Sequence, residues 1–181
     1  MKFSKSLIPK IFLILITNQF FLNNNKVKAA EDIKIIYSVF SRTVTVNSLK
    51  NFAKDGTSSK KLRRILNATD SPYNQIQLVL NKNFEIPITI ASKLVYSEIG
   101  NIVLSRLSSI IHPPIANDER TGVLALRSSI VQGINLGNGQ INLIKFFESY
   151  PTKTVILNVS ALNKVMNKVG SISELLDFFT N

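Results

Sequence analysis

The sequence predicts an α+β fold that is mostly helical, with a small sheet formed by an N-terminal hairpin and one late strand. Two observations carry this prediction. Side chains alternate between faces, with many β-branched or aromatic residues, in the runs 33–40, 43–46 and 153–159. Between these runs, apolar residues recur at spacings of three and four, as on helices with one buried side. Because an isolated hairpin is only marginally stable, we expect the late strand to join it in one sheet.

The composition is that of a single globular domain. The chain has 181 residues, of which 45% are hydrophobic and 18% charged, so it can bury a core of its own. We expect one α+β domain over residues 31–181, since no repeat or long linker divides them. The chain has no cysteine, which excludes disulfides, thiolate metal sites and a cysteine nucleophile.

Residues 1–29 are predicted to form a secretory signal peptide. The segment opens with lysines and continues with an apolar run of about 12 residues, where a membrane span needs roughly 20. Cleavage after Ala29 fits best and cleavage after Ala30 next. The mature protein would then be extracytoplasmic, in the periplasm, in the thylakoid lumen or outside the cell. An uncleaved anchor is the alternative.

The formal net charge of the whole chain is +11, but five of its lysines lie in the leader. The remainder carries 17 basic and 11 acidic residues, a net charge of +6. Such a domain could meet anionic headgroups, acidic polymers or an acidic protein face. Since we expect export, we expect no nucleic-acid partner, and membrane contact only through the signal sequence or a weak surface association.

After the leader, the two strand-like runs should form a hairpin with Ser41 and Arg42 in its turn. A short helix should follow, capped by Asn47 or Ser48. We expect Gly56 to end this helix, because glycine adopts the left-handed conformation at the lowest cost.

A basic cluster comes next, interleaved with apolar residues at helical spacing: Lys60, Lys61, Arg63 and Arg64. Four cations within five residues raise the local potential and could dock an anionic partner. The ordinary interpretation is the solvated face of an amphipathic helix whose apolar side is buried. We keep the four residues as candidate interaction residues.

Two helices are predicted between residues 70 and 95. Asp70 and Pro72 should cap and open the first. Its inward side chains should be Tyr73, Ile76, Val79 and Leu80. Pro87 should open the second, with its inward side formed by Ile88, Ala91 and Val95.

Ser97 followed by Glu98 predicts another helix start. Its buried stripe should run up to the two prolines that end it, through Ile99, Ile102, Val103, Leu107 and Ile110. The stretch 86–111 is apolar, and its only cations are Lys93 and Arg106. Core packing is therefore favoured over an interfacial membrane helix.

The clearest pattern lies in residues 116–151. Asp118 should cap a helix whose apolar stripe includes Val123, Leu126, Ile130 and Ile134. After a turn at residues 137–139, a second helix should carry Ile141, Ile144, Phe146 and Phe147. Arg120 and Arg127 lie on one flank of the first helix. We expect Arg127 to form a buried or interfacial ion pair, with a plain surface arginine as the alternative.

The chain should close with two helices. Ser160 is expected to cap the first, which Gly170 would end, and Ser171 with Glu174 has the spacing of a capping box for the second.

No complete catalytic motif is present in the sequence. A Ser-His-acid site needs a histidine, and the only one is His112, beside two prolines, which we interpret as structural. There is no G-x-S-x-G elbow. The carboxylates have the spacings of ordinary surface helices, and residues 137–139 form a turn and no phosphate loop. We therefore expect no catalytic residue, cofactor or metal.

Segments from Glu31 to Phe179 nevertheless occur in the order found in a known family. They are residues 33–37 with 41–46, Leu49, Phe52, Ala53 and Gly56, Pro87 with 92–96, 121–122 with 125–127, 144–151 and 153–157. The chain resembles a cyanobacterial domain of unknown function (domain of unknown function 1400), usually found after a signal peptide and before an α/β-hydrolase domain of lipase or esterase type. The resemblance implies that the catalytic serine, acid and histidine belong to that following domain, which we expect this protein to lack.

Three functional hypotheses follow. The first is a non-catalytic, extracytoplasmic domain that binds a partner, either a hydrolase domain on another chain, as a lid would, or another extracytoplasmic protein. The second is a hydrolase of esterase or lipase type, truncated or with an unconventional site. The third is binding of lipid or another apolar ligand between helices of the stretch 86–111.

Overall fold

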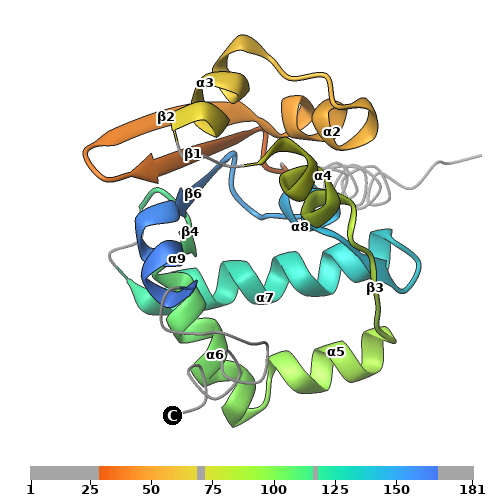
Figure 1. Cartoon of the computed structure of the whole chain (residues 1–181). Coiled ribbons are helices and arrows are strands. Elements are labelled where there is room, and N and C mark those ends of the chain that lie inside the picture. Colours follow the sequence, from red (N-terminus) through yellow and green to blue (C-terminus); the bar gives the residue numbers. More distant parts are fainter. Residues whose placement is uncertain (1–28, 69–71, 116–117, 167–181) are drawn as a thin grey trace, which may run out of the picture.

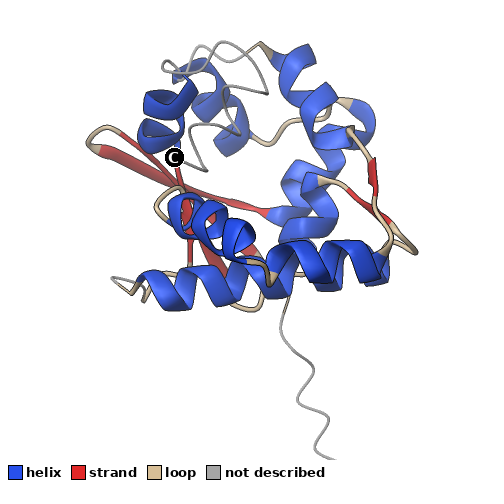
Figure 2. Ribbon diagram, turned by 90° about the horizontal axis from the view of Figure 1, so that it is seen from below, coloured by secondary structure: helices blue, strands red, loops and turns tan. Residues whose placement is uncertain are grey.

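The computed structural model describes residues 29–68, 72–115 and 118–166. It confirms the predicted α+β class, with helices around one four-stranded sheet of order β2-β1-β6-β4. Figure 1 shows the helix α7 running through the middle of the molecule, with α5 and α6 below it and α3 at the top. In Figure 2 most of the ribbon is helical, and a short strand pair lies apart from the main sheet.

The N-terminal hairpin consists of β1 (Asp32–Tyr37) and β2 (Phe40–Thr45). Its turn is Ser38-Val39, so the predicted turn at Ser41-Arg42 is wrong. Ser38 has a φ of 53°, which allows a two-residue connection. The resulting register sets Ile33 opposite Val44, and both side chains are buried. A turn three residues later would break this pair, so burial selects the observed register.

The late strand β6 (Thr154–Asn158) joins the hairpin as predicted, parallel to β1. Its other edge pairs antiparallel with β4 (Ile111–His112), which the sequence did not predict. The predicted helix up to the prolines is therefore too long, because the chain leaves the helix early to satisfy the edge of β6. A second pair, β3 (Phe84–Glu85) with β5 (Gln140–Ile141), was also not anticipated.

The first helices begin close to the hairpin. The helix α2 (Val46–Asp55) starts where β2 ends, so its N-cap is Thr45, whose hydroxyl accepts from the Ser48 amide at 3.1 Å, and neither Asn47 nor Ser48. Gly56 ends it in the left-handed conformation, φ 76°, as predicted. The helix α3 (Lys60–Ala68) follows and lies over the hairpin (Figure 1).

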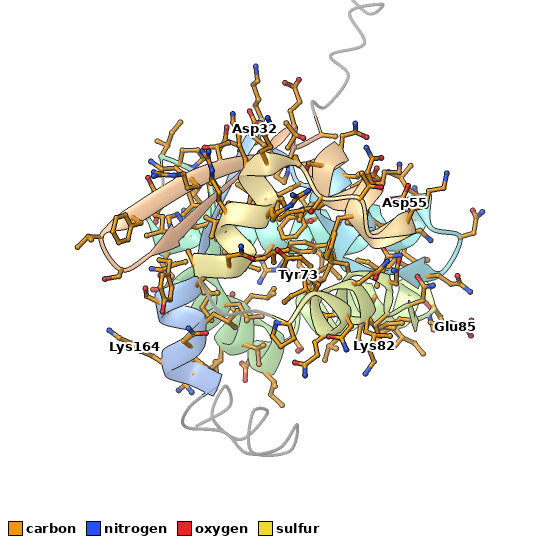
Figure 3. The ribbon with its side chains drawn as sticks, turned by 45° about the horizontal axis from the view of Figure 1, so that its top comes forward. Asp32, Asp55, Tyr73, Lys82, Glu85 and Lys164 are labelled. Atoms are coloured by element: carbon orange, nitrogen blue, oxygen red, sulfur yellow. The ribbon has the colours of Figure 1, made fainter. Side chains whose placement is uncertain are left out.

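The helix α4 (Tyr73–Asn81) has Pro72 as its N-cap, without a side-chain hydrogen bond. The predicted cap Asp70 lies outside the described residues. Of the four side chains expected inward, Leu80 is buried and Ile76 half-buried. Val79 is 52% exposed, and Tyr73, which Figure 3 labels at the start of α4, is 39% exposed while its ring meets that of Phe52 edge-on at 6.1 Å. The predicted inward face was thus too wide.

The helices α5 (Ile88–Val95) and α6 (Glu98–Ser108) form a connected pair below α7. Pro87 is the N-cap of α5, as the sequence suggested. Ser97 caps α6 by accepting a hydrogen bond from the Gly100 amide at 3.0 Å, which confirms the predicted helix start.

The helix α7 (Glu119–Leu136) is capped by Asp118, as predicted, and ends at a turn in which Asn138 and Gly139 both have positive φ. The next helix, α8 (Leu143–Glu148), starts later than predicted because Ile141 belongs to β5. Between them, the Ser129 hydroxyl donates to the Phe146 carbonyl at 2.5 Å inside the core. This core joins both helices to the sheet through Leu126, Phe147 and Val155, among others.

The last described helix, α9 (Val159–Met166), follows β6 directly. The predicted cap Ser160 therefore lies inside the helix, and Asn158 takes the capping position by accepting from the Ala161 amide at 3.0 Å. The Ser160 hydroxyl instead accepts from the Ser38 amide at the hairpin turn, at 2.7 Å. The predicted end at Gly170 and the helix after Ser171 lie outside the described residues. Among the described helices, none is both long enough and apolar enough to span a bilayer.

Candidate functional site

The helices α5 and α6 and the joint between them carry six large apolar side chains that are at least 38% exposed. We call this the α5–α6 surface: Ile88, Ile90, Leu94, Tyr96, Ile99 and Ile102. Tyr96 is 67% exposed and Ile99 59%, whereas Ala91, Val95 and Leu104 are buried, so the expected core packing holds for only one side of the stretch 86–111. Exposed apolar side chains gathered in one short stretch of chain mark a candidate binding surface.

The packing of α6 on α7 explains why its isoleucines point outward. The buried side of α6 consists of Gly100, Leu104 and Ser108, four residues apart. A Cβ added at Gly122 of α7 would lie only 2.7 Å from the Ser108 Cβ, so the two helices approach closely through small residues. The predicted stripe is therefore wrong at Ile99 and Ile102, whereas Ile110 is buried as expected and Leu107 packs against the core.

Arg127 connects α7 to the joint between α5 and α6. Its Nε donates to the Val95 carbonyl at 2.7 Å, and its Nη2 donates to the Asn101 Oδ1 at 2.9 Å. The guanidinium carbon lies 4.8 Å from the centre of the Tyr96 ring. These partners are uncharged, and among the described residues Arg127 forms no ion pair, so the buried ion pair is not found there. An ion pair with a binding partner stays a prediction, and the half-buried Arg127 is no plain surface arginine. It holds the joint, and with it Tyr96, in a fixed position.

Arg120 lies in the exposed first turn of α7. It shares a shallow hollow with Arg127, Asp118 and Glu119, so the structure brings the two flank arginines together as the sequence suggested. The Thr121 hydroxyl donates to the Asp118 carboxylate at 2.8 Å and, with the Arg120 amide, lowers the pKa of that carboxyl. An ionised Asp118 suits its role as helix cap.

The basic cluster lies on the exposed face of α3, while Leu62, Ile65 and Leu66 of the same helix are buried. This confirms the amphipathic helix. Docking of an anionic partner by Lys60, Lys61, Arg63 and Arg64 stays a prediction. In Figure 1, α3 and the α5–α6 pair lie at opposite ends of the molecule, so they form separate surfaces.

A cavity of about 340 Å³ lies between the hairpin and α3. The hairpin contributes Ile35, Tyr37, Phe40 and Arg42 to it, and α3 contributes Arg64 and Ile65. The sequence did not predict this cavity, because the hairpin and α3 each show an ordinary amphipathic pattern. A hint was present in the alternation of strand residues, which puts Ile35 and Tyr37 on one face.

His112 does not form part of a catalytic constellation among the described residues. It is half-buried in β4, and its Nδ1 lies 2.9 Å from the Pro113 carbonyl oxygen. A hydrogen bond to a carbonyl requires the proton on Nδ1, so the Pro113 carbonyl orients the ring. In the same part of the chain, no three histidine, aspartate or glutamate side chains gather where they could hold a metal ion.

Comparison with known proteins gives one match. Neither the curated proteins nor the solved structures contain a match to this chain. A family model matches residues 29–158, which includes every described element up to the end of β6. The match covers most of the 181 residues, and the chain belongs to the family described as alpha/beta hydrolase of unknown function (DUF1400).

Proposed function

We propose that this protein is a non-catalytic, extracytoplasmic domain that binds an α/β-hydrolase domain on another chain through the α5–α6 surface. The observation that carries the proposal is the outward direction of Ile90, Leu94 and Ile99 on helices whose joint is fixed by Arg127. A rigid apolar surface loses little conformational entropy on binding, which favours a protein partner of complementary shape.

The choice of a hydrolase domain as the partner rests on the family. The family is described as alpha/beta hydrolase of unknown function, while the ring of His112, the only histidine of the chain, bonds to the Pro113 carbonyl. An accessory domain that covers a hydrolase would account for both facts, since lids close over such sites and exclude water. A membrane surface fits the α5–α6 surface less well, because Lys93 and Arg106 are the only cations of the stretch 86–111.

The packing at the start of the described residues favours one of the two proposed cleavage sites. Ala30 is buried, with 5% of its surface exposed, and the Glu31 amide donates to the Lys153 carbonyl at 2.9 Å. Cleavage after Ala29 keeps Ala30 in the core, whereas cleavage after Ala30 removes it. We therefore expect the protein purified from exporting cells to begin at Ala30. Intact-mass measurement checks this, and a chain that begins elsewhere would contradict the proposed cleavage site. Recovery of the full-length chain from the cytoplasmic fraction would contradict the location.

The partner can be tested by affinity capture of the tagged chain from its native cells, followed by identification of the bound protein. We expect an α/β-hydrolase domain, and loss of capture when Leu94→Asp or Ile99→Asp places a charge in the interface. Leu78→Asp is the matched control, because Leu78 is 71% exposed on α4. Capture that survives Leu94→Asp, or binding to liposomes alone, would contradict the proposal.

A hydrolase activity of the chain itself is the second candidate, favoured by the family description. Broad ester and peptide assays with His112→Ala as control decide between the two. We expect no turnover. Turnover that His112→Ala abolishes would replace the binding function by a catalytic one.

A further inference from the structure

We propose that the cavity between the hairpin and α3 binds a single-chain amphiphile with an anionic head group, of the fatty-acid carboxylate class. This site is separate from the α5–α6 surface and goes beyond the proposed function. Its apolar floor would take the hydrocarbon chain, and Arg42 and Arg64 would bind the carboxylate.

The sheet register places the lining residues on one face. Ile35 lies opposite Arg42 and Tyr37 opposite Phe40, so the four side chains share the face of the hairpin that α3 covers. Figure 3 shows α3 lying across the two strands. The volume of about 340 Å³ is near the lower end of the range of about 300–1,000 Å³ for small-molecule pockets. This favours one hydrocarbon chain over a two-chain lipid.

The apolar lining of the cavity suits a hydrocarbon chain. Ile35 and Ile65 are only 9% and 8% exposed, so the floor belongs to the hydrophobic core. Phe40, at the entrance, is 63% exposed, and a bound chain would cover it. Burying this ring and the chain together supplies the apolar part of the binding free energy.

The charge around the cavity favours an anion. The hairpin, α2 and α3 contain only two acidic residues, Asp32 at the start of β1 and Asp55 at the end of α2, and neither lines the cavity. Arg42 donates from Nη1 to the Ser41 carbonyl at 2.9 Å, which leaves its other N–H groups available. Within the described residues the Arg64 guanidinium has no hydrogen bond or ion pair. Guanidinium groups with available N–H donors match the two oxygen atoms of a carboxylate.

The test is calorimetric titration of the full chain with decanoate below its aggregation concentration, and with decanol as the uncharged analogue. We expect decanoate to bind at least about tenfold more tightly than decanol, because charge-assisted hydrogen bonds are stronger than neutral ones. The double variant Arg42→Gln with Arg64→Gln should remove this difference and leave decanol binding unchanged. Both arginines are exposed, so the fold should survive, which circular dichroism checks.

The matched control is Lys60→Gln with Arg63→Gln, which removes the same charge from α3 outside the cavity. It should change decanoate binding by less than about twofold, since only the long-range field changes. The proposal is overturned if decanoate does not bind, if decanol binds as tightly, or if the control loses as much affinity as the double variant. Binding to anionic vesicles without decanoate binding would also overturn it, because the surface potential alone would then suffice.

Discussion

Most large apolar side chains of α7 are buried or half-buried, whereas most of those on α5 and α6 are exposed. Leu126 of α7 is 2% exposed and Ile134 is fully buried, whereas Leu94 of α5 and Ile99 of α6 are 57% and 59% exposed. The helix α7 has neighbours on several sides, namely α5, α6, α8 and β4, as Figure 1 shows. The helices α5 and α6 pack mainly on α7. The comparison shows that burial depends on how many sides of a helix find a partner, and less on how apolar the helix is.

Truncating one leucine in each region gives the largest expected contrast. Leu126→Ala should lower the free energy of unfolding by about 2–5 kcal/mol, because it leaves a cavity in the core. Leu94→Ala should change it by less than about 0.5 kcal/mol, since the side chain is already in water. Urea unfolding followed by circular dichroism measures both. Equal losses would show that the α5–α6 surface is covered in the folded protein.

The close contact between α6 and α7 can be broken at Gly122. Gly122→Ala should cost about 1–3 kcal/mol, because the new Cβ meets the Ser108 Cβ at 2.7 Å and the helices must separate. Gly133→Ala is the control on the same helix. Its Cβ would meet the end of the Ile141 side chain, which can move, so its cost should be smaller. A larger loss at Gly133 would contradict the packing described for α6.

Arg127 of α7 links this helix to the joint between α5 and α6, and a substitution there tests the link. Arg127→Lys keeps the charge but loses the fork that reaches both the Val95 carbonyl and Asn101, so we expect a loss of about 1–2 kcal/mol. Arg120→Lys, on the exposed first turn, should stay within about 0.5 kcal/mol. Hydrogen exchange of the α5 and α6 amides should speed up in Arg127→Lys alone. Unchanged exchange would mean that Arg127 does not fix the joint.

The smallest expected effect concerns Tyr150, which belongs to the buried core. Its ring is fully buried, and its hydroxyl has no hydrogen-bond partner in the described part of the chain. Tyr150→Phe should therefore leave the free energy of unfolding unchanged or raise it by up to about 1 kcal/mol. Thermal unfolding at pH 7 measures this, and a clear loss of stability would reveal a partner for the hydroxyl.

The same residue makes a pH prediction. Burial raises the pKa of Tyr150 above that of an unfolded tyrosine, about 10. The stability linked to this difference is fully present below that pH and is lost as the pH rises above it, because only the unfolded state ionises. The variant Tyr150→Phe has no hydroxyl to ionise at this position, so it does not lose this part of its stability. Its advantage over the native chain should therefore grow in urea unfolding above about pH 10.

Local patterns predicted several elements correctly. The strand-like runs, the caps Ser97 and Asp118 and the helix end at Gly56 follow from side-chain preferences that act over a few residues. The wrong predictions concern segments whose structure depends on partners far away in the sequence. The chain around His112 became a strand because β6 offered an open edge.

The candidate sites were less predictable. The sequence marked the basic face of α3 and the arginines at 120 and 127, but it gave Arg127 a charged partner where the fold supplies the Val95 carbonyl and Asn101. The cavity under α3 required the hairpin register and the helix together. Neither element predicts it alone, since a cavity is a property of two surfaces.

By itself, the sequence determined the fold class, the order of most elements and the family resemblance, because these depend on local periodicity and residue type. Only the tertiary structure decided which apolar faces are covered. Ile99 and Leu126 are equally apolar in the sequence, yet one is exposed and the other buried. The physical reason is that the hydrophobic effect rewards any apolar contact, while the close approach at Gly122 and the limited number of neighbours determine which contacts can form.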